Sequence, residues 1–243
     1  MDDGLMSAPK SCRKMFCAIL TAVSFAACAP VTPDRPFSKS PLYFDTIISD
    51  LEMWHIEAES GARVSSQDGK MTVIAPGGAT IWFKPRLHAP VEITYKVTAV
   101  DKGGLHDRVS DLNQFWMASD PDNEDIFGID RTGRFGEYDA LMLYYVGVGG
   151  HNNTRTRFRR YVGEIGNRPL LPEHDLTDPR FLIEGNRRYE IRIVSEGYRQ
   201  RFFRDGELIF DITDYEPYLS GHFALRTVRN RLIVEDFVVR ELR

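Results

Sequence analysis

Three arginines alternate along one short segment, residues 153–161, and their spacing could create an anion-binding surface. If this segment is a strand, Arg155, Arg157 and Arg159 share one face with Tyr161, since side chains alternate along a strand. Guanidinium groups on one face repel each other unless an anion or acidic side chains lie across them. They bind planar acidic groups such as carboxylates through paired hydrogen bonds. The segment therefore predicts a cationic groove for an acidic ligand.

A second interpretation pairs the same arginines with the protein's own acids. Glu137, Asp139 and Glu164 lie in the neighbouring sequence. An exposed ion pair adds only about 0–1 kcal/mol to stability, so the charge pattern alone does not choose between a ligand groove and a solvated sheet face.

A glycine-flanked polar turn, Gly149-Gly150-His151-Asn152-Asn153, comes directly before the arginine segment. Turns at strand ends often carry binding residues. His151 is a candidate general base, because an imidazole with a pKa of about 6.5 takes up a proton near neutral pH. Asn152 and Asn153 are candidate substrate-binding amides. The alternative is that the asparagines only satisfy the turn and that His151 is merely exposed.

A further candidate surface is the strand expected at 112–118. Gln114 and Trp116 share one face of it, opposite Asn113. An aromatic ring stacks on the C–H face of a sugar while amides bond its hydroxyls, so all three are candidate substrate-binding residues. A tryptophan in the protein core is the equally weighted alternative.

These residues include the groups needed for β-elimination on a polyuronide. The reaction needs a cation to neutralise the carboxylate, a base for the α-proton and an acid for the leaving oxygen. Arg157 or Arg159 is the candidate cation, His151 the base, and Tyr144 or Tyr161 the acid. A lyase acting on an acidic polysaccharide is thus favoured, with a non-catalytic glycan-binding protein as the alternative.

Glycoside hydrolysis is a weaker possibility. It needs two carboxylates, about 5.5 Å apart for retention and about 6.5–9.5 Å apart for inversion. Glu137 and Asp139 are expected to alternate onto one face and offer such a pair.

No cofactor is predicted from the sequence. The histidines show no zinc-binding spacing, and the acidic run at 120–125 lacks the glycine and spacing of an EF-hand loop. A structural calcium ion is left open, without a location. All three cysteines precede residue 29, which excludes thiol chemistry in the body. The net charge of −4 argues against a nucleic-acid partner.

The elements that must position these residues are short strands. Residues 90–99 alternate apolar and polar side chains, as expected of a strand with one buried face. Asp205-Gly206 predicts a two-residue hairpin turn, and a short helical turn is expected near 45–52. Further strands are expected at 71–75, 79–84, 112–118, 141–147, 155–162, 188–195, 199–204, 207–211, 221–227 and 232–241. This spacing predicts an all-β sandwich or barrel.

Motifs in the C-terminal part narrow this choice. Residues 188–241 contain a Y-x-I-x-I strand, the DG hairpin, a G-x-F-x-L-R-T strand and a final V-E-D-F-V-V strand. This part resembles concanavalin-like jelly-roll domains of secreted carbohydrate-active proteins. Residues 111–121 and 135–161 resemble the YesU-like group, which is associated with polysaccharide degradation. The resemblance implies a jelly-roll β-sandwich of two antiparallel sheets, with an acidic polysaccharide or oligosaccharide as partner.

The N-terminal residues have the pattern of an export signal. Basic residues at 10, 13 and 14 precede an apolar run at 15–27, which is too short to span a bilayer. Phe25-Ala26-Ala27-Cys28 resembles the lipobox of bacterial lipoproteins, which implies lipidation of Cys28. We therefore expect a signal peptide at 1–27, a Pro-rich tether at 28–40 and a jelly-roll domain at 41–243. The protein would be exported and held on a bacterial membrane by its lipid alone, facing the periplasm or cell surface.

Overall fold

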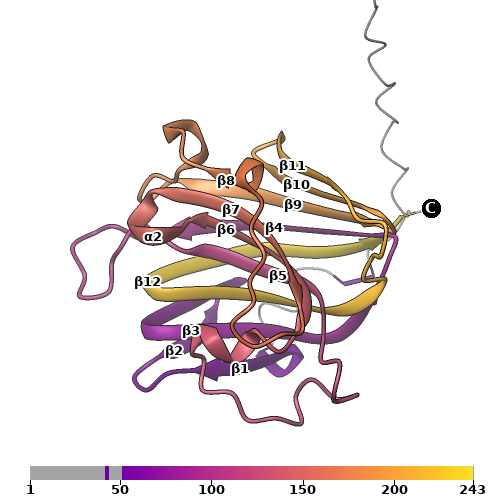
Figure 1. Cartoon of the computed structure of the whole chain (residues 1–243). Helices are drawn as coiled ribbons and strands as arrows, with labels where there is room; N and C mark the ends of the chain where they lie inside the picture. The colour runs from indigo at the N-terminus through magenta and orange to yellow at the C-terminus, as the bar shows by residue number, and fades with distance from the viewer. Residues whose placement is uncertain (1–41, 44–50, 243) are drawn as a thin grey trace, which may run out of the picture. The chain divides into compact units, whose positions relative to one another are not determined.

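The described part of the chain is almost entirely antiparallel β-structure (Figure 1). The computed structural model describes residues 42–43 and 51–242, so the signal peptide, the tether with Cys28 and most of the expected turn at 45–52 lie outside it. The strands are β1 (Trp54–Ala58), β2 (Arg63–Gln67), β3 (Lys70–His88), β4 (Val91–Ala99), β5 (Leu112–Ser119), β6 (Met142–Gly149), β7 (Arg155–Val162), β8 (Asp175–Leu176), β9 (Arg188–Glu196), β10 (Arg199–Arg204), β11 (Glu207–Thr213) and β12 (Ser220–Glu241). The helical segments are η1 (Leu51–Met53), η2 (Phe135–Tyr138), α2 (Gly150–Asn153), η3 (Pro172–His174) and η4 (Pro179–Phe181).

Two long strands, β3 and β12, run through both layers of the sheet (Figure 1). The first half of β12 pairs with the second half of β3 and with β5, and β6, β7 and β8 follow in order. The second half of β12 pairs with the first half of β3 and with β4, and β9, β10 and β11 follow. We call these the first and the second layer. This confirms the expected sandwich of antiparallel sheets.

The two long strands bend where they pass from one layer to the other. Pro76-Gly77-Gly78 lies at the bend of β3, and Arg229 lies at the bend of β12 with a φ of 50°. The β3–β12 register shifts between Val228 and Asn230, as at a β-bulge. Each long strand had been expected as two separate strands, because the bend residues resemble turn residues in the sequence. The hydrogen-bonded ladder instead continues on both sides of the bend.

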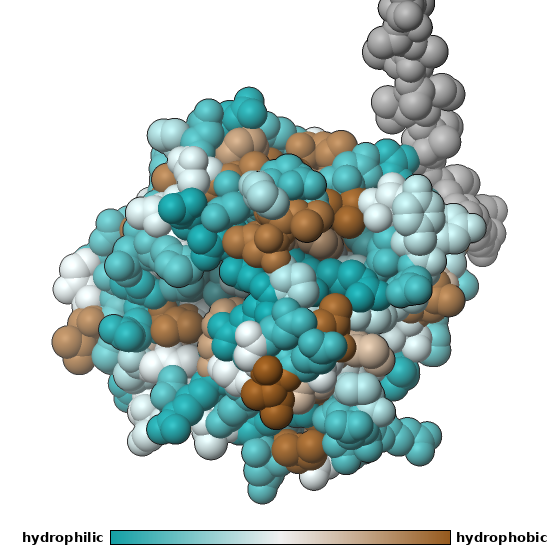
Figure 2. Space-filling view, viewed as in Figure 1, coloured by the Kyte–Doolittle hydropathy of each residue, from teal (hydrophilic) through white to brown (hydrophobic). Residues whose placement is uncertain are grey.

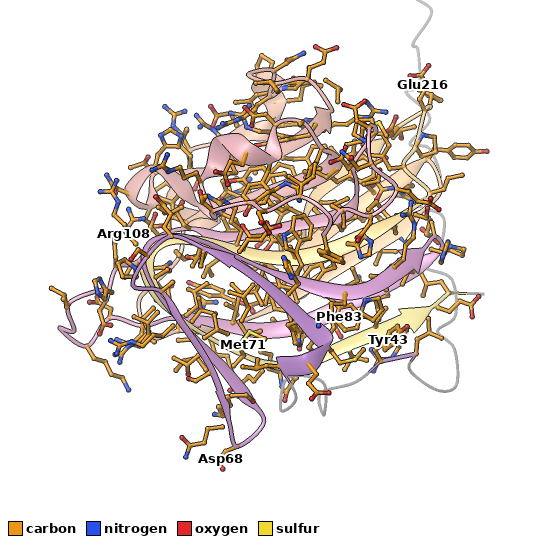
Figure 3. The ribbon with its side chains drawn as sticks, turned by 90° about the horizontal axis from the view of Figure 1, so that it is seen from below. Tyr43, Asp68, Met71, Phe83, Arg108 and Glu216 are labelled. Carbon is orange, nitrogen blue, oxygen red and sulfur yellow. The ribbon has the colours of Figure 1, made fainter. Side chains whose placement is uncertain are left out.

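The main core lies between the two layers. It joins Phe83 and Trp116 of the first layer to Met71 and Phe202 of the second, all almost fully buried. Hydrogen bonds also cross the core: Trp116 Nε1 donates to Gln200 Oε1 at 2.9 Å. Figure 3 shows Met71 and Phe83 on the two halves of β3, with the β2–β3 turn at Asp68 projecting from the body.

A second aromatic cluster covers part of the outer face of the first layer. The connection between β5 and β6, residues 120–141, folds over that face and buries Ile126 and Tyr138 against Trp82, Phe115 and Tyr161. This connection is held by buried ion pairs. Arg131 lies 3.4 Å from Glu57 and 3.2 Å from Asp120, and Trp82 Nε1 donates to Glu57 at 2.8 Å. The connection leaves the part of this face that carries Asn113 and Arg159 uncovered.

Most of the expected strands are present, with a few local differences. The hairpin expected at 199–211 is confirmed, with its second strand extending to Thr213. Asp205 and Gly206 have positive φ values of 52° and 80°. The strands β1, β2 and β8 were not expected. The strand β2 is polar and largely exposed, and β8 has only two residues. Among the described residues, no helix has the length and apolar character needed to cross a membrane.

Candidate functional site

A pocket of about 540 Å3 lies on the open part of the first layer's outer face and extends to α2. Seven arginines line it: Arg108, Arg155, Arg157, Arg159, Arg168, Arg226 and Arg229. In the view of Figure 2, hydrophilic residues dominate the surface around α2. The pocket brings together residues of β5, β6, β7 and β12, which are neighbours in the first layer.

Alternation along β7 places its arginines as predicted. Arg155, Arg157 and Arg159 line the pocket, whereas Arg160 on the opposite face binds Asp214 at 2.8 Å. Asp175 of β8 accepts two hydrogen bonds from Arg157, at 2.9 and 3.0 Å, and one from Arg155 at 3.2 Å. Its hydrogen bonds with Arg157 hold the pKa of Asp175 below its usual range.

Two further arginines are fixed by aspartates at the borders of the pocket. Arg108 binds Asp111, and it also donates to Asn152 Oδ1 at 2.5 Å and to the carbonyl oxygen of Val228 at 2.6 Å. Arg168 lies 2.5 Å from Asp139. Asp111 and Asp139 therefore neutralise one arginine each, while Asp175 is shared by two.

The remaining three arginines have no carboxylate partner among the described residues. Arg229 is exposed at the rim, Arg159 is half-buried, and Arg226 is only 1 % exposed. Arg159 donates to the carbonyl oxygen of Arg168. Arg226 donates to Thr80 Oγ1 at 2.7 Å and to the carbonyl oxygen of Gly133 at 3.0 Å. Burial lowers the pKa of Arg226, because burial disfavours an uncompensated charge.

The uncharged floor of the pocket includes Asn113, Tyr145 and Gly147, with Phe135 at one side. The Tyr145 hydroxyl donates to Asn113 Oδ1 at 3.3 Å. Burial raises the pKa of Tyr145, so this phenol stays protonated at neutral pH. A side chain at position 147 would overlap the Tyr145 hydroxyl, and glycine keeps this part of the floor free.

The turn α2 has an unusual backbone. His151, Asn152 and Asn153 have φ values of 52°, 58° and 58°, in the left-handed region. This region costs most residues about 1–2 kcal/mol each and is best tolerated by glycine and asparagine. It places His151 Nε2 2.6 Å from Arg157 Nη1. Arg157 thus contacts the imidazole ring through this nitrogen.

Several of the residues expected at the site lie elsewhere. The expectation that Gln114 and Trp116 bind a ligand is wrong, since they are 1 % and 0 % exposed and face the core. Gln114 Nε2 donates to the carbonyl oxygen of Val146 at 2.7 Å. Asn153 is bound to the backbone of Ile183 at 2.7 and 3.0 Å, and so it has a structural role.

Neither of the tyrosines expected as the acid lines the pocket. Tyr144 is buried on the core side, and its hydroxyl donates to Asp214 at 2.6 Å. Tyr161 shares the arginine face as expected, but it belongs to the second aromatic cluster, where burial raises its pKa to about 12. The pocket contains Tyr145 in their place.

The pair of carboxylates expected for hydrolysis is also not formed. Glu137 lies in η2 and accepts hydrogen bonds from Thr132 at 2.6 and 2.7 Å. Asp139 follows η2, is buried and binds Arg168. The segment is helical because it crosses the sheet as a connection and does not pair with a strand. Within the described residues, no cluster of three or more His, Cys, Asp or Glu side chains could hold a metal ion.

The pocket also contains five side chains that were not expected at the site: Arg108, Tyr145, Arg168, Arg226 and Arg229. Arg226 lies directly opposite Asn113 on the neighbouring strand, and Tyr145 lies opposite Arg159. Only the register of these pairs reveals that they share a face. Arg108 and Arg229 lie 121 positions apart in the chain, yet Arg108 Nε donates to the carbonyl oxygen of Arg229.

Residues 73–237, which include the whole pocket, match the model of a single protein family. The chain belongs to the DUF6250 family. That family is described as a domain of unknown function, and no curated protein matches the chain.

Solved structures share the fold of this DUF6250 protein at low sequence identity. A Bacillus subtilis protein of unknown function with a galectin-like fold has a TM-score of 0.66 at 16% identity, covering 86% of this chain and 99% of its own. The carbohydrate-binding module CBM66 of Bacillus subtilis has a TM-score of 0.53 at 15% identity, with 78% and 96% covered. An endo-β-1,3-glucanase of Pyrococcus furiosus has a TM-score of 0.52 at 10% identity, with 87% and 99% covered. These similarities establish a galectin-like fold.

Proposed function

We propose that this protein binds an acidic glycan, carboxylated or sulfated, in the arginine-lined pocket. The observation that carries the proposal is the set of three pocket arginines, Arg159, Arg226 and Arg229, without a carboxylate partner among the described residues. Proteins that share this fold include a carbohydrate-binding module and a glucanase, which supports a glycan as the ligand class.

Charge and size both suit such a ligand. Burying a charge without a counter-ion is costly, and an acidic group in the pocket would offset that cost for Arg226. Guanidinium groups also bind carboxylate and sulfate oxygens better than neutral hydroxyls. A volume of about 540 Å3 falls within the roughly 300–1,000 Å3 typical of small-molecule sites.

Two neighbouring arginines offer a matched test. Arg159 faces the pocket and Arg160 faces away and binds Asp214. We expect Arg159→Met to weaken binding to acidic polysaccharides about 10- to 100-fold, since charged hydrogen bonds contribute about 1.5–3 kcal/mol. Arg160→Met should leave affinity within about twofold of wild type.

The measurement is affinity electrophoresis and calorimetry with polygalacturonate, alginate and a sulfated galactan, and with a neutral glucan as control. Binding of the acidic polymers should weaken as salt concentration rises, because salt screens exposed charges. Equal binding of the neutral and acidic polymers, or equal affinity of both variants, would overturn the proposal.

A second candidate function is β-elimination on the bound glycan. It is favoured by the position of His151 at the pocket, with Arg157 beside it. Arg159, which has no carboxylate partner among the described residues, would neutralise the carboxylate of the glycan. His151 Nε2 would remove the proton on the adjacent carbon once the ligand displaces its hydrogen bond with Arg157. That electron pair then forms the carbon–carbon double bond as the glycosidic C–O bond breaks, and the protonated Tyr145 hydroxyl, which lines the pocket, would donate its proton to the leaving oxygen.

The test of elimination is the ultraviolet absorbance of an unsaturated uronide product. His151→Asn tolerates the left-handed backbone and should abolish product formation while binding persists. Binding without any unsaturated product from the wild type would leave a purely glycan-binding protein. Hydrolysis is less favoured, because among the residues lining the pocket the sole carboxylate is Asp111, which Arg108 already binds.

We further propose that the chain is exported and lipidated at Cys28, in the cell envelope of a bacterium. Support comes only from the sequence of residues 10–28. Metabolic labelling with a fatty acid and membrane fractionation test it. The wild type should be labelled and sediment with membranes, and Cys28→Ala should lose the label. An unlabelled wild type would contradict lipidation.

A further inference from the structure

The pocket is closed on the side of β3. Residue 133 of the β5–β6 connection lies directly on the sheet, with a φ of +89°. A Cβ atom there would lie 2.7 Å from Ala58 Cα and 2.9 Å from the carbonyl oxygen of Glu57. A Cβ atom on Gly78 would overlap the carbonyl oxygen of Gly133. These backbones touch, and no ligand can pass between them.

The pocket is also closed toward the second aromatic cluster. Phe135 forms this wall, with the guanidinium carbons of Arg168 and Arg226 at 4.5 and 4.7 Å from its ring centre. Arg168 is held in place by Asp139. Beyond this wall the outer face is filled by buried aromatic side chains.

The opposite side of the pocket is open. Its border consists of His151, Asn152 and Arg229, which are exposed, and of Arg108, which is partly exposed. Figure 3 shows Arg108 at one end of the sandwich and Glu216 at the other. The pocket thus has a mouth at the α2 end of the sandwich and a blind inner end.

Arg226 lies at the blind end. It is 1 % exposed and has no carboxylate partner among the described residues, and its buried Nε atom has no hydrogen-bond acceptor there. A buried cation that lines a pocket and lacks a carboxylate partner is the group expected where a ligand's acidic group is bound.

We infer that the pocket takes the end of a glycan chain, with the acidic group of the terminal sugar residue bound at Arg226. This inference rests on the proposed glycan binding and deepens it. A groove open at both ends admits the middle of a polymer, whereas a blind pocket admits only a chain end. The ligand class is then a glycan whose terminal residue carries a carboxylate or a sulfate ester.

Binding stoichiometry tests this inference. Calorimetry is done with short and long fractions of oligogalacturonate, alginate oligomer and sulfated galactan. Chain-end binding predicts the same number of protein molecules per chain, and a similar affinity per chain, at both lengths. A number that rises with chain length would overturn the inference and leave acidic-glycan binding standing. No binding in any of the three series would overturn both.

A variant next to Arg226 tests the position of the acidic group. Asn113 faces Arg226 across the β5–β12 pair, and Asn113→Asp changes the side chain's charge with almost no change in its size. The new carboxylate should neutralise the charge of Arg226 in place of a ligand. It should therefore reduce the affinity for the short acidic oligosaccharides at least tenfold, which is about 1.4 kcal/mol. Arg229→Gln at the mouth should have a smaller effect. Unchanged affinity in a folded Asn113→Asp protein, verified by circular dichroism, would place the acidic group elsewhere.

Discussion

Asp175 balances two of the pocket arginines, and its ionisation links the site to the stability of the fold. The hydrogen bonds from Arg157 lower the pKa of Asp175, whereas in the unfolded chain it returns to about 3.9. Between the lowered pKa and about pH 3.9, the folded state therefore binds fewer protons than the unfolded chain. The ionised Asp175 thus stabilises the fold above about pH 4. That contribution is lost as pH falls through the lowered pKa.

The corresponding prediction concerns Asp175→Asn. At neutral pH the variant should have a lower free energy of unfolding than the wild type, because Arg155 and Arg157 lose their carboxylate partner. The difference should shrink as pH falls below about 4 and through the lowered pKa of Asp175, because the wild-type carboxylate then becomes protonated. Urea denaturation at a series of pH values measures it. A difference that stays constant over this range would show that Asp175 acts through shape and not through charge.

Substitutions at two glycines with positive φ can measure the cost of backbone strain apart from the cost of steric contact. Gly206 has a φ of +80° in the β10–β11 turn, and a Cβ atom there would have no heavy atom within 4 Å. Gly133 has a φ of +89°, and a Cβ atom there would collide with Ala58. Both positions strain an L-residue, but only the second is also crowded.

We predict that Gly206→Ala lowers the free energy of unfolding by about 1 kcal/mol, the cost of a left-handed backbone. Gly133→Ala should cost about 1–3 kcal/mol more, since overpacking adds to the strain. It should also move the β5–β6 connection off the sheet and weaken glycan binding, which Gly206→Ala should not do. Chemical denaturation and calorimetry measure both effects. Equal destabilisation by the two substitutions would show that the connection is not pressed against β1.

The sequence predicts elements better than it predicts the site, and the strand β5 shows why. The alternation of buried and solvent-exposed side chains that identifies the core face of a strand is absent here, since seven of its eight residues are buried. One face packs in the core and the other forms the pocket floor and the second cluster. The sequence therefore could not decide whether Trp116 and Gln114 bind a ligand or face the core, and the structure places both in the core. In β7 the prediction that Arg155, Arg157 and Arg159 share one face was right, because the charged side chains themselves identify the outer face.

For the molecule as a whole, β3 and β12 couple the two layers. Each strand belongs to the first layer at one end and to the second at the other. Phe158 of β7 and Phe210 of β11 also meet across the core at 5.9 Å. Neither layer can lose its central strands without disrupting the other, so the sandwich should unfold as one cooperative unit.

Val234→Ala tests this coupling from within the second layer. Val234 of β12 is fully buried and pairs with Met71 and Val97, so the cavity should destabilise the protein by about 2 kcal/mol. Hydrogen exchange of the slowest amides should report the same loss in β6 of the first layer as in β9 of the second. The matched control is Val64→Ala, at a half-buried position of β2, which should have a smaller effect on both layers. A loss confined to β9 would mean that the layers open separately and that the pocket stays intact while the second layer unfolds.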